Sequence, residues 1–248
     1  MDEMLETRGT REAVTLEARE TRGTRETQPL GTQVTRGILE TQPLSTQETL
    51  ILQDVQKRWG EQVFSPVSCT LGPGEGLGIF GHNGSGKSTL LDIIAGLTQP
   101  SAGKVVMRGM VGYVMQHAGF VESLSFKDNL LSEAYLSGLR GQEARRQAHL
   151  AAARLEMLPF WTKRYGKGSS GMKGRLSVAA ALLASPQILL LDEAFNYLDE
   201  RSIEQTHHVL LAEKERGATL LMVSHNREDF VGLCERVLEL PSAQITAL

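Results

Sequence analysis

From Leu50 onward, short apolar runs alternate with stretches of helical periodicity. The runs LILQDV, VFSPVSCTL, GLGIFG, VGYVMQ, QILLLD and ATLLMVS each predict a strand. Apolar strands that are separated by helices are typical of a mostly parallel sheet covered on both faces. The first two runs lie close together in the sequence, which favours antiparallel pairing. The pattern therefore predicts an α/β fold, with a mostly parallel sheet and an antiparallel β edge.

The segment between Gln116 and Leu176 has a helical pattern instead. Ser125 and Asp128 fit a helix capping pair, and the apolar spacing that follows them is helical. A second helix, rich in alanine and arginine, is predicted over residues 142–157. We interpret the block at about residues 117–176 as a small helical subdomain inserted into the α/β core.

The first 48 residues contain a 14-residue repeat whose copies start at Thr7, Thr21 and Thr35. Each copy carries a glycine and the last two carry a proline, while apolar residues are sparse and aromatic residues are absent. Such a segment cannot bury enough surface to offset its ordering entropy. We predict a disordered tail over residues 1–48 and one domain over residues 49–248. A repeated docking tail for a partner is the alternative.

Composition excludes several classes of protein. A formal net charge of −3 gives no electrostatic reason to expect nucleic-acid binding. The two cysteines, Cys69 and Cys234, lie far apart in the sequence, which argues against a disulfide framework and favours a reducing compartment. The longest apolar run, residues 176–184, is too short to span a membrane, and the N-terminus has no apolar signal core. A cytoplasmic location is expected.

The stretch GHNGSGKST follows a predicted strand and precedes a predicted helix. It fits the pattern G-x-x-x-x-G-K-[ST], in which backbone N–H groups cradle phosphates, the lysine reaches the β/γ-phosphates and the hydroxyl binds magnesium. The strand–loop–helix context makes a chance match improbable. The predicted phosphate-binding residues are Gly81, Asn83, Gly84, Ser85, Gly86, Lys87, Ser88 and Thr89.

Polar residues at the ends of other predicted strands complete the chemistry. Asp192 and Glu193 end the run QILLLDE, so one carboxylate can hold a metal while the other polarises an attacking water. Gln116 and His225 end two further strands, where Gln116 could sense the metal and His225 could reach a γ-phosphate. We predict Glu193, His225 and Gln116 as catalytic residues. The predicted magnesium ligands are Ser88, Gln116 and Asp192.

Taken together, these motifs resemble the nucleotide-binding subunit of ABC transporters. The resemblance covers residues 50 to about 240 and includes GSSGM at residues 168–172, which stands where the family has LSGGQ. It implies a P-loop ATPase that binds ATP and Mg²⁺ in a sandwich dimer, here a homodimer, and energises a separate transmembrane permease at the cytoplasmic face of the membrane. The signature form SSGM looks more like that of exporters.

The resemblance also implies roles for four residues. Ser169 and Gly171, which are kept from the family signature, would contact the γ-phosphate held by the partner chain, aided by a helix N-terminus. Trp59 would stack on adenine, with an ordinary core aromatic as the alternative. Asp199 would act across the dimer interface. A soluble ABC ATPase that does not transport, or a regulatory subunit that hydrolyses poorly, remains the alternative function.

Overall fold

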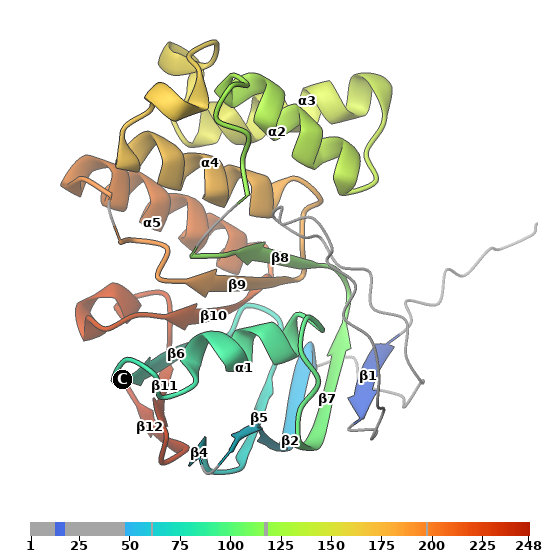
Figure 1. Cartoon of the computed structure of the whole chain (residues 1–248), viewed down its shortest axis with the longest axis vertical. Coiled ribbons are helices and arrows are strands. Elements are labelled where there is room, and N and C mark those ends of the chain that lie inside the picture. Colours follow the sequence, from blue (N-terminus) through green and yellow to red (C-terminus); the bar gives the residue numbers. More distant parts are fainter. Residues whose placement is uncertain (1–12, 18–47, 61, 117–118, 197) are drawn as a thin grey trace, which may run out of the picture.

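The protein is described by a computed structural model that covers residues 13–17, 48–60, 62–116, 119–196 and 198–248. Two sheets stack beside a group of helices, and α1 (Lys87–Ile94) lies between the sheets (Figure 1). The predicted α/β class is confirmed.

The larger sheet carries the functional strand ends. Its order is β12-β11-β6-β10-β9-β8, and all neighbours pair in parallel except β12, which is antiparallel to β11. Because parallel strands point the same way, their carboxyl ends meet at one edge of the sheet. The strands are β6 (Gly76–Gly81), β8 (Val111–Val114), β9 (Ile188–Asp192), β10 (Thr219–Val223), β11 (Arg236–Leu240) and β12 (Gln244–Ala247).

The antiparallel strands form a sheet of their own, which the sequence analysis had placed at an edge of the parallel sheet. This second sheet has the order β1-β7-β2-β5, and a short hairpin of β3 and β4 stands beside it. A register shift in β2 between Leu52 and Val55 interrupts its pairing. Its strands are β1 (Ala13–Glu17), β2 (Leu50–Gln56), β3 (Arg58–Trp59), β4 (Gln62–Val63), β5 (Val67–Leu71) and β7 (Ala102–Arg108).

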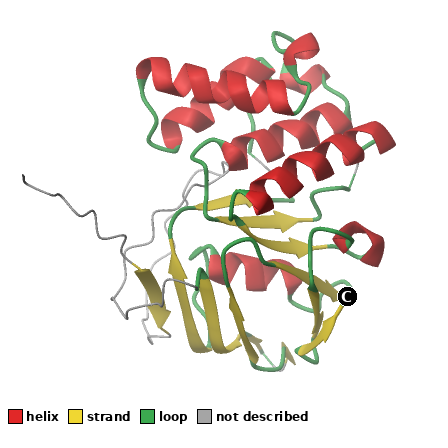
Figure 2. Ribbon diagram, turned by 180° about the vertical axis from the view of Figure 1, so that it is seen from behind, coloured by secondary structure: helices red, strands yellow, loops and turns green. Residues whose placement is uncertain are grey.

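Side-chain alternation divides the parallel sheet between two hydrophobic cores. Leu190 and Leu221 point into the core that holds α1 and the antiparallel sheet. Leu189 and Leu220 point to the opposite face, which the other helices cover (Figure 2). These helices are α2 (Phe126–Leu136), α3 (Gly141–Arg154), α4 (Ser170–Leu182) and α5 (Glu200–Glu215), with 3₁₀ turns η1 (Leu158–Phe160), η2 (Tyr165–Lys167) and η3 (Arg227–Phe230).

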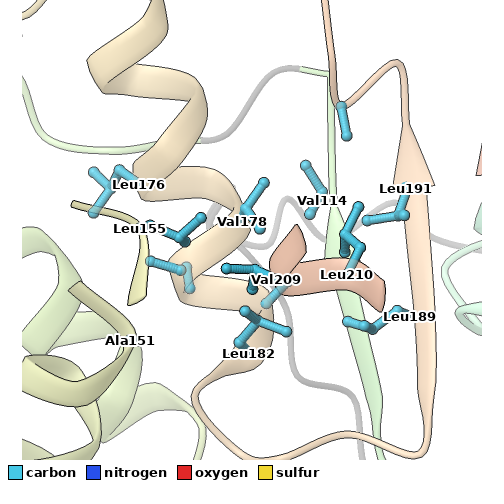
Figure 3. Close-up of a cluster of buried hydrophobic side chains, with 14 of the residues drawn as sticks. Val114, Ala151, Leu155, Leu176, Val178, Leu182, Leu189, Leu191, Val209 and Leu210 are labelled. Atoms are coloured by element: carbon cyan, nitrogen blue, oxygen red, sulfur yellow. The ribbon is translucent and has the colours of Figure 1, made fainter. Parts of the chain in front are cut away.

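The predicted helical block contains α2, α3 and the start of α4. The expected cap is present, since the Asp128 backbone N–H donates to Ser125 Oγ at 3.0 Å. The block has no core separate from that of the sheet. Leu155 and Leu176 belong to the same buried cluster as Leu189 and Leu191 of β9, with α4 between them (Figure 3).

The N-terminal strand β1 differs from the predicted disordered tail. Residues 13–17, AVTLE, pair antiparallel with β7, with Thr15 opposite Val106. Alternating β-branched and apolar residues suit an edge strand. In the other two repeat copies the position of Thr15 is taken by Pro29 and Pro43, and proline lacks the N–H that a sheet needs. Residues 1–12 and 18–47 lie outside the described residues, so the rest of the tail prediction stays a prediction.

Buried Glu133 of α2 provides a test of the helical packing. Its side chain is 5% exposed, and within the described part of the chain its Oε2 atom has no hydrogen-bond partner. Burial raises the pKa of this carboxyl from 4.5 to about 7. The folded state thus keeps a proton that the unfolded state releases between these pH values, so stability falls as pH rises through this window.

Glu133→Gln removes the charge and should stabilise the protein only where that charge exists. We expect the melting temperature near pH 8 to rise by about 3–8 °C, and the melting temperature at about pH 4.5 to change little. Glu204→Gln is the matched control, because the Glu204 side chain is 75% exposed. An equal rise at both pH values would contradict the charge-burial argument.

Candidate functional site

Two glycines shape the loop between β6 and α1. Gly84 has φ +81° and Gly86 has φ +96°, a region that residues with a Cβ rarely adopt. A Cβ on Gly86 would also lie 2.8 Å from Cδ1 of Phe64. The tight turn therefore depends on glycine at both positions, and Phe64 closes the side of the loop at Gly86.

The loop presents hydrogen-bond donors at the start of α1. No side chain caps this helix, and its first turn holds no acidic residue. Lys87 is 6% exposed, and its Nζ donates to the carbonyl oxygens of Gly81 at 2.8 Å and His82 at 3.0 Å. Uncapped backbone N–H groups together with a buried ammonium group form an anion-binding site.

A cleft of about 750 Å³ opens beside this loop. It brings together residues that follow four different parallel strands, namely the loop after β6, Gln116 after β8, Glu193 after β9 and His225 after β10. Most of the residues predicted for phosphate binding and catalysis therefore share one cavity. Its lining consists of Trp59, Asn83, Gly84, Gly86, Lys87, Ser88, Thr89, Gln116, Glu193 and His225.

Asp192 ends β9 beside this cleft and has an unusual environment. Its side chain is 4% exposed, and among the described residues Oδ1 finds no hydrogen-bond partner. Burial raises the pKa of the Asp192 carboxyl to about 6, opposed by a hydrogen bond from Ser88. A buried carboxylate oxygen without a donor, next to a hydroxyl, fits a hard divalent cation. In the described ranges, no group of three or more His, Cys, Asp or Glu side chains is arranged so that it could hold a metal ion by itself.

Glu193 follows directly and is held by two amides. Gln116 Nε2 donates to Glu193 Oε2 at 3.1 Å, and Asn196 Nδ2 donates to the same oxygen at 2.6 Å. Glu193 has φ +52°, and its backbone N–H donates to the Val223 carbonyl at 3.1 Å. A non-glycine residue in this region is uncommon and occurs often at functional sites. This backbone conformation turns the carboxylate toward Gln116.

Trp59 stands at the rim of the cleft and is 43% exposed. Its ring centroid lies 6.3 Å from that of Phe64, at an angle of 55°. The exposure excludes the alternative that Trp59 is an ordinary core aromatic. Stacking on a base stays a prediction.

The signature loop lies apart from the cleft. Ser169 caps α4 by accepting a hydrogen bond from the Met172 backbone N–H at 3.3 Å. Gly171 is buried, and a Cβ added at this position would lie 3.1 Å from Asp199 Oδ2. Asp199 in turn caps α5 through the Ser202 backbone N–H at 2.8 Å. Hydrogen bonding by the Ser202 side chain, followed by that of its backbone N–H, lowers the pKa of Asp199. None of Ser169, Gly171 and Asp199 is among the described residues that line the cleft.

Ser85 was predicted to bind phosphate; its side chain points inward, and a phosphate contact by Ser85 stays a prediction. It is 6% exposed, and its Oγ lies 2.7 Å from where a Cβ on Gly81 would stand. Two further residues at the site, Asn196 and Phe64, were not predicted from the sequence. A short amide three residues after a strand-end carboxylate is a weak signal for Asn196, and nothing local marks Phe64.

Comparison with known proteins gives one family. The family model described as "ABC transporter" matches residues 64–196. A relative from Bacillus subtilis, an uncharacterized ABC transporter ATP-binding protein, is 33% identical over 72% of this chain and 85% of its own length. The Nod factor export ATP-binding protein I of Rhizobium etli is 33% identical over 78% of this chain and 66% of its own length.

The fold agrees with solved structures as well. A dimeric post-hydrolysis state of the ATP-binding cassette MJ0796, bound to ADP and Pi, superposes with a TM-score of 0.70. The match covers 80% of this chain and 98% of that one at 24% identity. The predicted P-loop fold of ABC type is thereby confirmed.

Proposed function

Because this chain belongs to the ABC transporter family as an ATP-binding ATPase subunit, we propose that its cleft binds MgATP and that two chains enclose the nucleotides between them. The observation that carries the proposal is the cleft itself. It gathers an uncapped helix N-terminus, a buried lysine and the polar residues that follow four parallel strands. Carboxyl ends of parallel strands are where open α/β sheets bind ligands.

Different residues of the cleft would bind the base, the phosphates and the metal ion. The α1 N-terminus and Lys87 would neutralise the phosphates, while Trp59 at the rim would stack on the base. Ser88, Asp192 and Gln116 would hold Mg²⁺, which supplies charge neutralisation for the phosphates when bound. The unpartnered buried oxygen of Asp192 supports this assignment, because a bound cation would satisfy it.

Hydrolysis then depends on positioning an attacking water. The carboxylate of Glu193 would accept a proton from that water as general base, and His225 would donate a hydrogen bond to the γ-phosphate. Gln116 contacts Glu193 at 3.1 Å and follows β8 into the helical block, so it can pass a change at the γ-phosphate to that block.

A second chain would complete each site. Ser169, Gly171 and Asp199 are needed by the family mechanism but lie outside the cleft of their own chain. The N-terminus of α4 carries no acidic residue in its first turn and Ser169 is exposed, so it can approach an anion on a neighbouring molecule. A homodimer with two shared sites follows. The described ranges contain no helix long and apolar enough to cross a membrane. From the family resemblance, we assign transport to a separate transmembrane permease and place this chain at the cytoplasmic face of the membrane. Export stays a prediction.

A complementation experiment tests the shared site. The Lys87→Ala variant damages the phosphate loop, and Ser169→Asp places a charge where the γ-phosphate would sit while aspartate can still cap α4. We expect each variant alone to lose most ATP turnover. A mixed dimer contains one intact site, because the phosphate loop of one chain meets the signature loop of the other.

Recovery of turnover, or of an ATP-dependent mixed dimer, on combining the two variants is the expected result. Sites completed within one chain would give no recovery by either measurement. Wild-type turnover by Ser169→Asp alone would remove the signature loop from the site. Absent turnover by the wild-type chain, together with normal ATP binding, would instead favour a regulatory subunit that hydrolyses poorly.

A further inference from the structure

Glu193 receives two amide hydrogen bonds on one oxygen, and the proposed function uses only one of the donors. Gln116 and Asn196 both donate to Oε2, at 3.1 Å and 2.6 Å. Among the described residues no hydrogen bond to the other carboxylate oxygen, Oε1, is seen, and Glu193 lines the cleft. We propose that Asn196 is a positioning residue for ATP hydrolysis, whose amide fixes Oε2 of Glu193 so that Oε1 meets the attacking water. This inference rests on the proposed role of Glu193 as the base.

The two donors differ in what else they must do. Gln116 is exposed and is a predicted ligand of Mg²⁺, so its amide has a competing partner once nucleotide is bound. Asn196 has no such second role in the proposed site. Both amides donate to the same carboxylate oxygen, and the hydrogen bond from Asn196 is the shorter of the two. Hydrogen bonds to a charged acceptor are stronger than those between neutral groups. Asn196 is therefore the donor that can hold the carboxylate throughout the reaction.

The backbone between these residues keeps Asn196 in place. The Asn196 N–H donates to the Glu193 carbonyl at 3.0 Å, which closes a tight turn. Ala194 and Phe195 inside the turn are each 6% exposed and belong to the larger buried cluster. An asparagine in a turn commonly bonds to nearby backbone, but here its side-chain N–H goes to the carboxylate. The turn therefore holds the two side chains in direct contact.

The far side of the same loop is anchored on α4. A Cβ on Gly174 would lie 2.6 Å from Cδ2 of Leu198, so Leu198 packs directly over the helix backbone. Gly174 also lines a smaller cavity of about 210 Å³, together with Asn196, Gln116, Glu193, Ser170 and Lys173. Asn196 thus shares this cavity with the proposed base and with the first turns of α4.

The test compares two variants at this position. Asn196→Ala removes the donor, and we expect kcat to fall by about 10- to 100-fold, the effect of a hydrogen bond to a charged group, with KM for ATP unchanged. Asn196→Asp keeps the shape but sets two carboxylates against each other, so kcat should fall further. Gln205→Ala is the matched control, because this half-buried amide donates to the Arg154 carbonyl and does not line the cleft.

A double variant separates positioning from a purely structural role. If Asn196 acts through Glu193, adding Asn196→Ala to Glu193→Gln should leave the residual single-turnover rate unchanged. A structural role would lower that rate again and would lower the melting temperature of every Asn196 variant. Wild-type kcat in Asn196→Ala, or additive losses in the double variant, would overturn the inference. If Glu193→Gln alone keeps wild-type turnover, the proposed base is wrong instead.

Discussion

ATP turnover is expected to fall by about 10²- to 10⁴-fold in Glu193→Gln, the usual contribution of a general base. Glutamine keeps the side-chain shape and can still accept the hydrogen bonds from Gln116 and Asn196, which are 3.1 Å and 2.6 Å long in the structure. What it loses is the ability to take a proton from water. ATP binding should survive, because neither the α1 N-terminus nor Lys87 is altered.

A variant that binds ATP but does not hydrolyse it should accumulate in its ATP-bound state. We expect Glu193→Gln to accumulate as an ATP-bound dimer, visible as a doubled mass by size-exclusion chromatography with light scattering. The matched control is Glu204→Gln, a substitution of the same kind on the exposed side of α5. Turnover at the wild-type rate in Glu193→Gln would remove this residue from the role of base.

Lys87→Ala should abolish tight ATP binding. A hydrogen bond to a charged group contributes about 1.5–3 kcal/mol, so the affinity for ATP should drop by about 10- to 150-fold. Lys87 is 6% exposed, and its Nζ donates to two backbone carbonyls of the phosphate loop. Its removal also relieves a buried charge, so we expect the melting temperature without nucleotide to change little.

Calorimetric titration with ATP measures this loss directly. Lys57→Ala serves as the control, because Lys57 also donates to a backbone carbonyl, that of Gln99 at 2.6 Å, and does not line the cleft. Wild-type affinity in Lys87→Ala would place the triphosphate elsewhere in the chain.

The local sequence pattern was sufficient to predict those elements whose structure depends on neighbouring residues in the sequence. The strand ending at Asp192 is apolar on both faces, and the phosphate loop carries its own glycines, so both could be predicted from the sequence. Strand β7, residues 102–108, was not predicted, because its polar ends make it a strand only through pairing with β2, for example Leu50 opposite Met107. The separate antiparallel sheet was missed for the same reason.

The candidate site likewise contains residues that the local sequence pattern predicts and residues that it does not. Lys87, Gln116 and Glu193 could be assigned because each follows a predicted strand end or belongs to a recognised loop. Asn196 could not be assigned, since its contact depends on the positive φ of Glu193 and on a turn whose inner residues are buried. Ser169 and Asp199 followed from the family resemblance, because their partners would lie on another chain.

The hydrophobic cluster that joins the helical block to the sheet makes the two a single cooperative unit. Leu155, which follows α3, and Leu176 of α4 belong to the same buried cluster as Leu189 and Leu191 of β9 (Figure 3). Opening of α3 would therefore expose part of a core that β9 shares. Amide hydrogens of both elements should therefore exchange with solvent through the same global event. Any rotation of the block relative to the sheet would then require small sliding of packed side chains, so we expect the block to move as a stiff lever rather than as a tethered domain.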